Sequence, residues 1–351
     1  MNNYFDYPEP PTHSDISYDD KLEQFTKSFN IDETKEINEF FKKYGFVIIK
    51  NMVSVSNCDK TEKEITDLMK FDKNKPITYE KWSSFGKEKD GLVSRKPLFT
   101  PYILNNRQND KIFNIFSRLL ASTNLQVTYE SCYFLRPTKN IKFEDNSIRS
   151  IDGWKTKKTI KLDMDINKCY NEANEMINTL KNMNYTNLTN FINETCIFSF
   201  KATPLNIQGL INLSSNKNND GGFSCVPGFH KYFIHWHKHV CKNLSIQNNS
   251  YISNIKPHTD IYKKYIFDDN DPIKDKLVKI NMRIGSLLIW DNRIPYCIEP
   301  NNSNKFWLAQ QIKYSKKYNF VNNSRKHTIE KNLLNVKNKI QINKHLKTSL
   351  Y

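Results

Sequence analysis

Glycine is scarce in this sequence, with 9 residues among 351, and no tract rich in proline, glycine or serine interrupts it. Flexible linkers have that composition, so their absence argues against a string of tethered modules. No stretch approaches the roughly 18 apolar residues that a membrane-spanning helix needs. The acidic amino terminus lacks the apolar core of a secretory signal peptide. We therefore expect a soluble protein without a membrane span.

Cysteine pairs of the C-x-x-C kind are also lacking. The seven cysteines are residues 58, 132, 169, 196, 225, 241 and 297. Structural zinc sites usually use such pairs, and secreted disulfide frameworks usually use an even number of cysteines. Both are disfavoured, so we expect a reducing compartment, namely the cytoplasm.

Basic residues are in excess, with a formal net charge of +16, but they are unevenly placed. Residues 316–351 carry nine Lys or Arg and one acid, so this tail supplies +8, whereas residues 1–20 carry five acids and no Lys or Arg. Lysine, asparagine and isoleucine are abundant together, as expected for an AT-rich genome. The charge allows contact between the tail and an acidic protein or nucleic acid, but a solvated or disordered tail, or a marginal basic helix, is equally consistent with the pattern.

Aromatic residues are plentiful, with 22 Phe and 18 Tyr, so a sizeable core can form. Apolar spacing predicts helices over 33–44, 111–121 and 172–183, the first ending at Gly45. Strands are expected over 46–49, 126–135, 196–200, 207–213, 222–226, 287–290 and 308–314. Helices followed by short strands indicate an α+β protein with a jelly-roll core.

The expected organisation has three parts. Residues 1–25 are a flexible acidic segment with three prolines, 26–317 form one domain, and 318–351 form the basic tail. Two insertions are expected within the domain, at about 166–195 and 243–280, the second of them polar and irregular.

Four ordered segments carry a family resemblance. They are FFKKYGFVII at 40–49, IKLDMD at 160–165, QGLINL at 208–213 followed by DGGFSCVPGFHK at 220–231, and GSLLIWDNRIPY at 285–296. Together they resemble the phytanoyl-CoA dioxygenase-like family of the Fe(II)/2-oxoglutarate-dependent oxygenase superfamily. The resemblance implies a double-stranded β-helix, or jelly roll, over about 36–315. The family includes virus-encoded members, so host cytoplasm or the virion of a large DNA virus is a further expected location.

The family binds Fe(II) through a His-x-Asp pair and a later histidine, which leave positions open for 2-oxoglutarate and oxygen. An arginine about eleven residues beyond the last histidine binds 2-oxoglutarate. Carried onto this sequence, those positions hold Lys161, Asp163, Tyr296 and Trp307, so only Asp163 is retained. A lysine ammonium has no lone pair for a metal, and tryptophan has no charge for a carboxylate.

These departures suggest a degenerate iron site. We hypothesise that Lys161 supplies the positive charge of the missing metal, in a cluster with Asp163 and Tyr296, since an unpaired buried carboxylate is costly. The alternative is an outward-pointing Lys161, if the strand register differs by one residue.

Other candidates are weaker. Gln208, Arg293 and Lys305 are possible pocket residues, although Arg293 could simply pair with Asp291, and neither Lys305 nor Lys313 occupies the family's arginine position. The histidines at 230, 235, 237 and 239 resemble a metal cluster but lack a carboxylate nearby in sequence.

Three functions remain open. The first is a pseudoenzyme that has lost catalysis and keeps a binding or structural role, with a small-molecule ligand in the jelly-roll mouth. For this interpretation we expect no cofactor. The second is an active oxygenase with an atypical site that uses Fe(II) and 2-oxoglutarate. The third is a nucleic-acid-associated protein acting through the basic tail.

Overall fold

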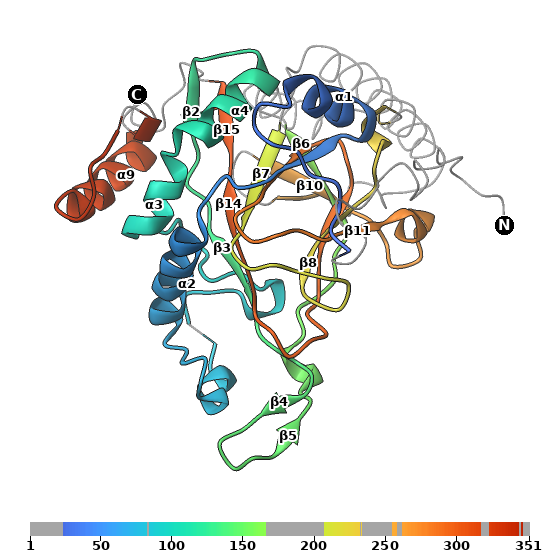
Figure 1. Ribbon diagram of the computed structural model, residues 1–351, viewed down its shortest axis with the longest axis vertical. Coiled ribbons are helices and arrows are strands. Elements are labelled where there is room, and N and C mark those ends of the chain that lie inside the picture. The colour runs from blue at the N-terminus through green and yellow to red at the C-terminus, as the bar shows by residue number, and fades with distance from the viewer. Residues whose placement is uncertain are drawn as a thin grey trace, which may run out of the picture.

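Two antiparallel sheets form the centre of the protein, with helices packed on one side (Figure 1). The computed structural model describes residues 24–82, 84–165, 207–231, 233, 255–257, 262–316, 323–343 and 345–346. The helix expected over 172–183, the strand expected over 196–200 and most of residues 1–25 lie outside these ranges. No described helix is both long enough and apolar enough to cross a membrane.

The first sheet has five strands in the order β1-β12-β7-β14-β3. Their bounds are β1 Phe46–Ile49, β12 Leu287–Asp291, β7 Ile207–Asn212, β14 Trp307–Ile312 and β3 Cys132–Leu135. Every residue of β1, β3 and β12 is buried, because one face meets the second sheet and the other meets helices. The expected strands over 46–49, 207–213, 287–290 and 308–314 are thereby confirmed.

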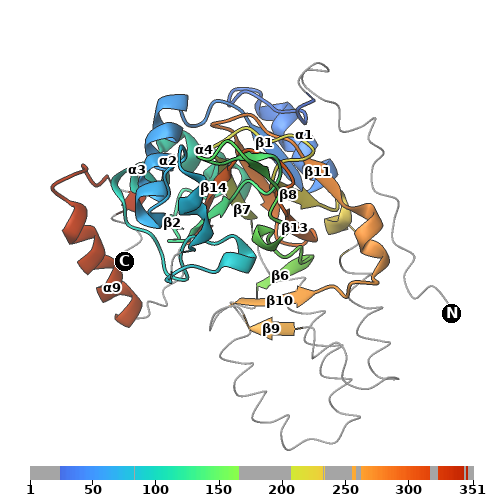
Figure 2. The ribbon, with the colours of Figure 1, turned by 90° about the horizontal axis from the view of Figure 1, so that it is seen from below.

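The second sheet has six strands in the order β11-β8-β13-β6-β10-β9. Their bounds are β11 Val278–Ile280, β8 Gly222–Cys225, β13 Tyr296–Glu299, β6 Lys161–Asp165, β10 Tyr262–Ile266 and β9 Ile255–Pro257. Figure 2 shows β6, β10 and β9 following one another toward one edge. The expectation that 243–280 is irregular is wrong for residues 255–257, 262–266 and 278–280: β9 and β10 extend the sheet beyond β6, and β11 pairs with β8. Backbone pairing with a sheet edge orders these polar strands despite their weak apolar pattern.

Two short strand pairs complete the described sheets. β15 (Tyr314–Lys316) pairs with β2 (Leu125–Val127), and β4 (Ile141–Lys142) forms a hairpin with β5 (Ile148–Arg149). The single strand expected over 126–135 is therefore two strands, β2 and β3, which lie in different sheets.

Helices α2 (Val55–Met69), α3 (Pro101–Arg107) and α4 (Asp110–Leu120) cover the outer face of the first sheet (Figures 1 and 2). Asn106 of α3 donates a hydrogen bond from Nδ2 to Oε1 of Gln310 in β14, at 2.8 Å. Phe116 of α4 packs over Gly209 of β7, where a methyl group would come within 2.9 Å of its ring. The helix expected over 111–121 is confirmed as α4.

Helix α1 (Thr34–Tyr44) immediately precedes β1. Its four buried residues are the predicted Ile37, Phe40, Phe41 and Tyr44. Gly45 ends the helix in the left-handed conformation, with φ of 75°, and its amide donates to the Phe41 carbonyl at 2.8 Å. This termination matches the prediction, because glycine alone adopts such a φ without steric cost.

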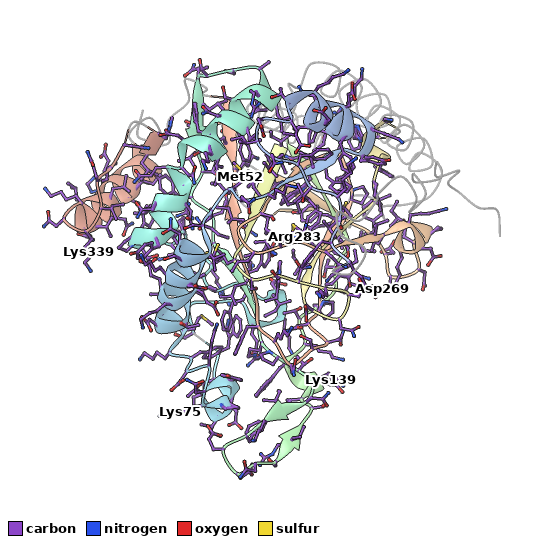
Figure 3. All side chains as sticks on the ribbon, in the orientation of Figure 1. Met52, Lys75, Lys139, Asp269, Arg283 and Lys339 are labelled. Atoms are coloured by element: carbon purple, nitrogen blue, oxygen red, sulfur yellow. The ribbon has the colours of Figure 1, made fainter. Side chains whose placement is uncertain are left out.

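The carboxy-terminal segment packs against the protein, which corrects the expectation of a solvated or disordered tail. Its described part includes helix α9 (Asn323–Val336), which lies outside α3 (Figure 1). The apolar residues Ile329, Leu333, Val336, Ile340 and Leu346 are buried. Lysines at 331, 337 and 339 are exposed, and Figure 3 places Lys339 at the periphery.

Polar contacts also tie this segment to the junction of α3 and α4. Asn343 Nδ2 donates to the Gln108 carbonyl at 2.7 Å, and His345 Nε2 lies 2.7 Å from an Asp110 carboxylate oxygen. The His345 ring stacks on Phe113 with 4.0 Å between centroids. The weak apolar periodicity of this segment did not predict that it packs against the protein. The packing uses only five apolar residues, which are spread over 18 positions.

We predict that Gly45→Ala destabilises the fold by about 1–3 kcal/mol, since it forces a left-handed φ on a residue with a side chain. The new methyl would also lie 2.6 Å from His230 Nδ1 and 2.8 Å from an Ile294 methyl. Gly153→Ala is the matched control, because no atom lies within 4 Å of its new Cβ. Urea denaturation of both variants measures the difference, and equal stability would contradict the prediction.

A second pair of variants tests the docking of α9. Leu333 is 3% exposed, whereas the neighbouring Leu334 is 59% exposed. Leu333→Ala should cost about 2–5 kcal/mol of folding stability, as for other buried leucines. Leu334→Ala should cost little, since its side chain is already in water. If thermal denaturation shows the two variants to be indistinguishable, α9 does not dock in solution as described.

Candidate functional site

Lys161 and Tyr296 lie directly opposite each other on the adjacent strands β6 and β13. The Lys161 Nζ atom is 4.9 Å from the centroid of the Tyr296 ring. Tyr296 is 3% exposed, so its ring is buried, whereas the Lys161 side chain is partly exposed. A cation over an aromatic face is attracted by the ring quadrupole, by about 0.5–2 kcal/mol. The structure thus brings these two predicted site residues together.

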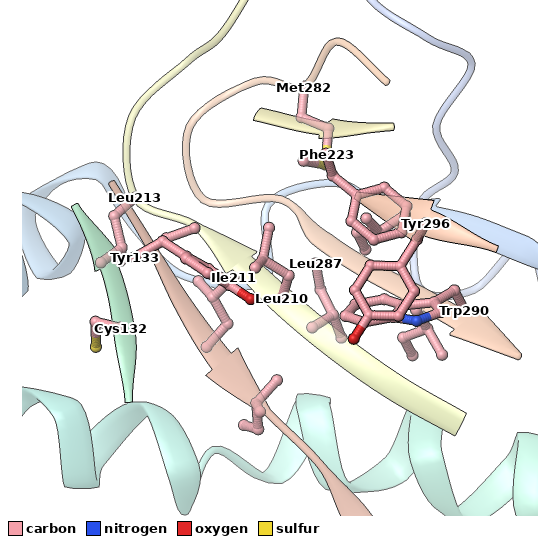
Figure 4. Packing of buried hydrophobic residues seen from close by; sticks show 14 of the residues in the cluster. Cys132, Tyr133, Leu210, Ile211, Leu213, Phe223, Met282, Leu287, Trp290 and Tyr296 are labelled. Atoms are coloured by element: carbon pink, nitrogen blue, oxygen red, sulfur yellow. The ribbon is translucent and has the colours of Figure 1, made fainter. Parts of the chain in front are cut away.

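Tyr296 also belongs to an aromatic cluster that joins the two sheets (Figure 4). Its ring stacks on Phe223 of β8 with 5.5 Å between centroids and lies 5.3 Å from Trp290 of β12. Phe223 and Trp290 are 4.7 Å apart. Because Trp290 belongs to the first sheet and the other two to the second, these residues lie between the sheets. Lys161 therefore reaches an inward-facing position, which contradicts the outward-pointing alternative.

The side chain of Asp163 lies outside the described residues. Its backbone pairs with Lys264 of β10. Of the predicted cluster, the structure describes the contact between Lys161 and Tyr296. The role of Asp163 stays a prediction.

Trp307, at the position that the resemblance assigns to the family's arginine, is fully buried at the start of β14. Its Nε1 donates to Oδ1 of Asn212 in β7, at 2.9 Å. Its ring stacks on Tyr133 of β3, with centroids 6.1 Å apart. The single donor of the indole is thus already used in a structural hydrogen bond, and nothing about the side chain offers charge to a carboxylate.

Two of the predicted pocket residues, Gln208 and Arg293, make different polar contacts. Gln208, which pairs with Trp290 across the first sheet, donates from Nε2 to Oδ1 of Asn292 at 3.0 Å. Arg293 binds the buried Asp291 carboxylate through Nε, at 2.9 Å, and through a terminal nitrogen. This contact raises the pKa of Arg293, and it is the simple pairing considered from the sequence.

The remaining cationic candidates lie elsewhere. Lys305 is exposed in the turn between β13 and β14, and its carbonyl accepts a hydrogen bond from Asn301. Lys313 is buried just beyond β14, where its carbonyl accepts from the Thr128 amide. Neither residue has a described contact with Lys161 or Tyr296.

Of the four candidate histidines, only His230 lies in the described ranges. Its Nε2 is 3.1 Å from the Lys42 carbonyl, and its ring packs on Gly45. Burial lowers its pKa, so it is neutral at pH 7. Residues 235, 237 and 239 lie outside the described part of the chain.

The side chains around Tyr296 do not fit Fe(II). Lys161 has no lone pair while charged, and a neutral phenol is a poor ligand. Cys225 faces Tyr296 from β8, but burial raises the pKa of its thiol well above the usual value. A neutral thiol is not the thiolate that binds metals. Within the described residues, no three His, Cys, Asp or Glu side chains form a metal-binding group.

Two polar residues of this region were missed by the sequence analysis. Trp290 and Asn292 are each 3% exposed, and Trp290 Nε1 and Asn292 Nδ2 have no hydrogen-bond partner among the described residues. Both lie within the WDNR motif, but a motif does not tell which donors find acceptors. That information comes only from the packed structure.

We predict different stability losses for two tryptophan variants that remove the same atoms. Trp307→Phe leaves Asn212 Oδ1 without its indole donor, which costs about 1–3 kcal/mol beyond packing. Trp290→Phe removes a donor that has no described acceptor, so it should cost only the lost packing. Urea denaturation of both variants measures the gap. A larger loss for Trp290→Phe would contradict this accounting.

No protein-family model matches the chain. A Dictyostelium discoideum protein described as "Putative phytanoyl-CoA dioxygenase" is 29% identical over 318 residues, covering 83% of this chain and 83% of that protein. Among solved structures, GlcNAc Inducible Gene 2 (DUF1479) from Candida albicans aligns with a TM-score of 0.52 and 14% identity, covering 90% of this chain and 71% of that one. The carbocyclase SnoK from nogalamycin biosynthesis, described as non-heme and alpha ketoglutarate dependent, aligns with a TM-score of 0.42 and 14% identity, covering 82% and 86%.

The Candida albicans structure shows a shared fold only, because so few residues are identical. The similarity to the Dictyostelium relative is not confined to one segment, since the match covers 83% of each chain. The resemblance carried by the four ordered motifs is thereby confirmed, and over most of its length this chain is similar to a phytanoyl-CoA dioxygenase-like protein.

Proposed function

We propose that this protein is a phytanoyl-CoA dioxygenase-like double-stranded β-helix whose iron site has been replaced by a lysine–tyrosine contact, and that it binds a ligand without oxidising it. The strand order supports the jelly roll. The strands from β6 to β14, taken in chain order, lie in the second, first, second, second, second, second, first, second and first sheets. A jelly roll is built by such crossing between two packed sheets.

The contact between Lys161 and Tyr296 carries the proposal. These residues occupy the positions that the resemblance assigns to the two iron-binding histidines, and they meet across one strand pair. An ammonium at this point would repel a divalent cation, because two positive charges at such short range repel each other. Trp307 adds to the argument, since its donor is committed to Asn212 and it has no charge for 2-oxoglutarate.

The second candidate is an active oxygenase that uses Fe(II) and 2-oxoglutarate through an atypical site. The name of the Dictyostelium relative favours it. Conversion of 2-oxoglutarate to succinate by the purified protein, supplied with Fe(II) and oxygen, would support this candidate over the first.

Contact between nucleic acid and the basic tail remains a separate proposal. Lys331 in the docked α9, and Lys337 and Lys339 just beyond it, are exposed and so accessible to phosphates. Binding of this kind would weaken steeply with salt. A charge reversal at Lys331, Lys337 and Lys339 would test it without disturbing the buried face of α9.

The decisive test is anaerobic loading with Fe(II) followed by metal analysis. The wild-type protein should retain almost no iron. The reversion Lys161→His, Tyr296→His, Trp307→Arg should bind about one iron per chain, because it restores both imidazoles and the carboxylate-binding arginine. A wild-type protein holding about one iron would overturn the proposal.

Two further variants separate the possible causes of any gain. Lys161→Gln removes the ammonium but supplies no imidazole, so it should remain iron-free if ligands are what is missing. The double variant Lys161→His, Tyr296→His keeps the buried Trp307 and guards against misfolding by a buried arginine. Circular dichroism should show native structure for each.

A further inference from the structure

Two buried N–H donors between the sheets lack acceptors in the described part of the chain. They are Nε1 of Trp290 and Nδ2 of Asn292, whose residues are each 3% exposed. A buried donor without a partner loses its hydration without compensation, and native proteins rarely leave one in that state. Two such donors only two residues apart therefore point to an acceptor that the described part of the chain does not provide.

The surrounding contacts hold these donors in place. Gln208 binds Asn292 Oδ1 through its own amide nitrogen, which turns Asn292 so that Nδ2 remains for another acceptor. Gln208 is also the strand partner of Trp290. The indole of Trp290 packs against Tyr296, whose ring carries the Lys161 ammonium on its face. Lys161 and Trp290 are thus linked through the Tyr296 ring, and Asn292 is linked through Gln208 to the strand pair that holds Trp290.

The charge of this group indicates the kind of acceptor. Arg293, the nearest other cation in sequence to Asn292, is committed to the Asp291 carboxylate. Lys161 makes no ion pair with any side chain in the described ranges; its described contact is with the Tyr296 ring. One available cation and two neutral donors match a group with one negative charge and several lone pairs, which is a carboxylate.

We propose that Lys161, Trp290 and Asn292 bind the carboxylate of a small organic monoanion, with the aromatic cluster of Tyr296, Trp290 and Phe223 flanking its apolar part. This inference rests on the proposed function, since it requires that Lys161 has displaced iron. It identifies the ligand class of that site and does not depend on 2-oxoglutarate chemistry.

Benzoate is a suitable probe, with benzamide as the neutral compound of the same shape and inorganic phosphate as the more highly charged anion. Ligand-observed NMR on the full-length protein in EDTA should show benzoate binding at least tenfold more tightly than benzamide or phosphate. Equal binding of benzoate and benzamide, tighter binding of phosphate, or no binding of benzoate would each overturn the inference.

Two substitutions test the assigned residues. Lys161→Met keeps an unbranched side chain, one atom shorter, but removes the charge, and it should abolish benzoate binding. Trp290→Phe keeps the aromatic ring and removes the donor, which should weaken binding on the order of tenfold, as expected for one hydrogen bond to a charged group. Trp307→Phe is the matched control, because its donor is already bound to Asn212, and the folded fraction should retain wild-type affinity. A loss of affinity in the control equal to that of Trp290→Phe would overturn the assignment.

Asp163→Asn separates this inference from the sequence-based cluster. If Asp163 neutralises Lys161 internally, benzoate should bind the Asn variant and not the wild type, and the inference fails. If the inference is correct, the wild type already binds. Iron retention by the wild type would instead overturn the proposed function, so the two failures are distinguishable.

Discussion

The pairing of β6 with β13 is the constraint on which the site depends. This antiparallel register sets residue 161 directly opposite residue 296, so whatever occupies these positions shares one small volume between the sheets. The resemblance assigns imidazoles there, and this sequence has an ammonium and a phenol. The two residues are mutually consistent, because an ammonium is attracted to the face of an aromatic ring and Tyr296 supplies that face. Under the proposed function, the backbone geometry of a metal site is kept while a side-chain cation contributes the positive charge.

The position that the resemblance assigns to the family's arginine is occupied here by a core residue. Trp307 fills it with a large apolar ring and directs its one donor to Asn212, whose own Nδ2 donates to Asn216 Oδ1 at 3.2 Å and to the Met282 carbonyl at 3.1 Å. These bonds link β14, β7 and the loop before β12. A hydrogen-bonded core residue at this position favours stability, since a buried guanidinium without a carboxylate would be unpaired.

Sequence patterns predicted what depends on local periodicity and ordered motifs. The α1 helix with its Gly45 terminus, α4, and most strands of the first sheet follow from apolar spacing alone. Docking of the tail and the strands β9 and β10 did not follow, because both depend on surfaces built by distant parts of the chain. The positions of Lys161, Tyr296 and Trp307 came from the resemblance, but their contacts did not. That the lysine lies on the tyrosine ring, and that Arg293 is paired with Asp291, are products of tertiary geometry.

Trp290 and Trp307 show why residue type alone is a poor guide to function. Both are tryptophans on the inner side of the first sheet, and both are at least nine-tenths buried. One indole has its acceptor within the protein, and the other has none among the described residues. Burial removes water from both indole N–H groups. Within the described part of the chain, only Trp307 regains a hydrogen bond for this loss, by donating to Asn212. A structural role accounts fully for the polar group of Trp307, whereas no described residue accepts a hydrogen bond from that of Trp290, which is why we propose a ligand there.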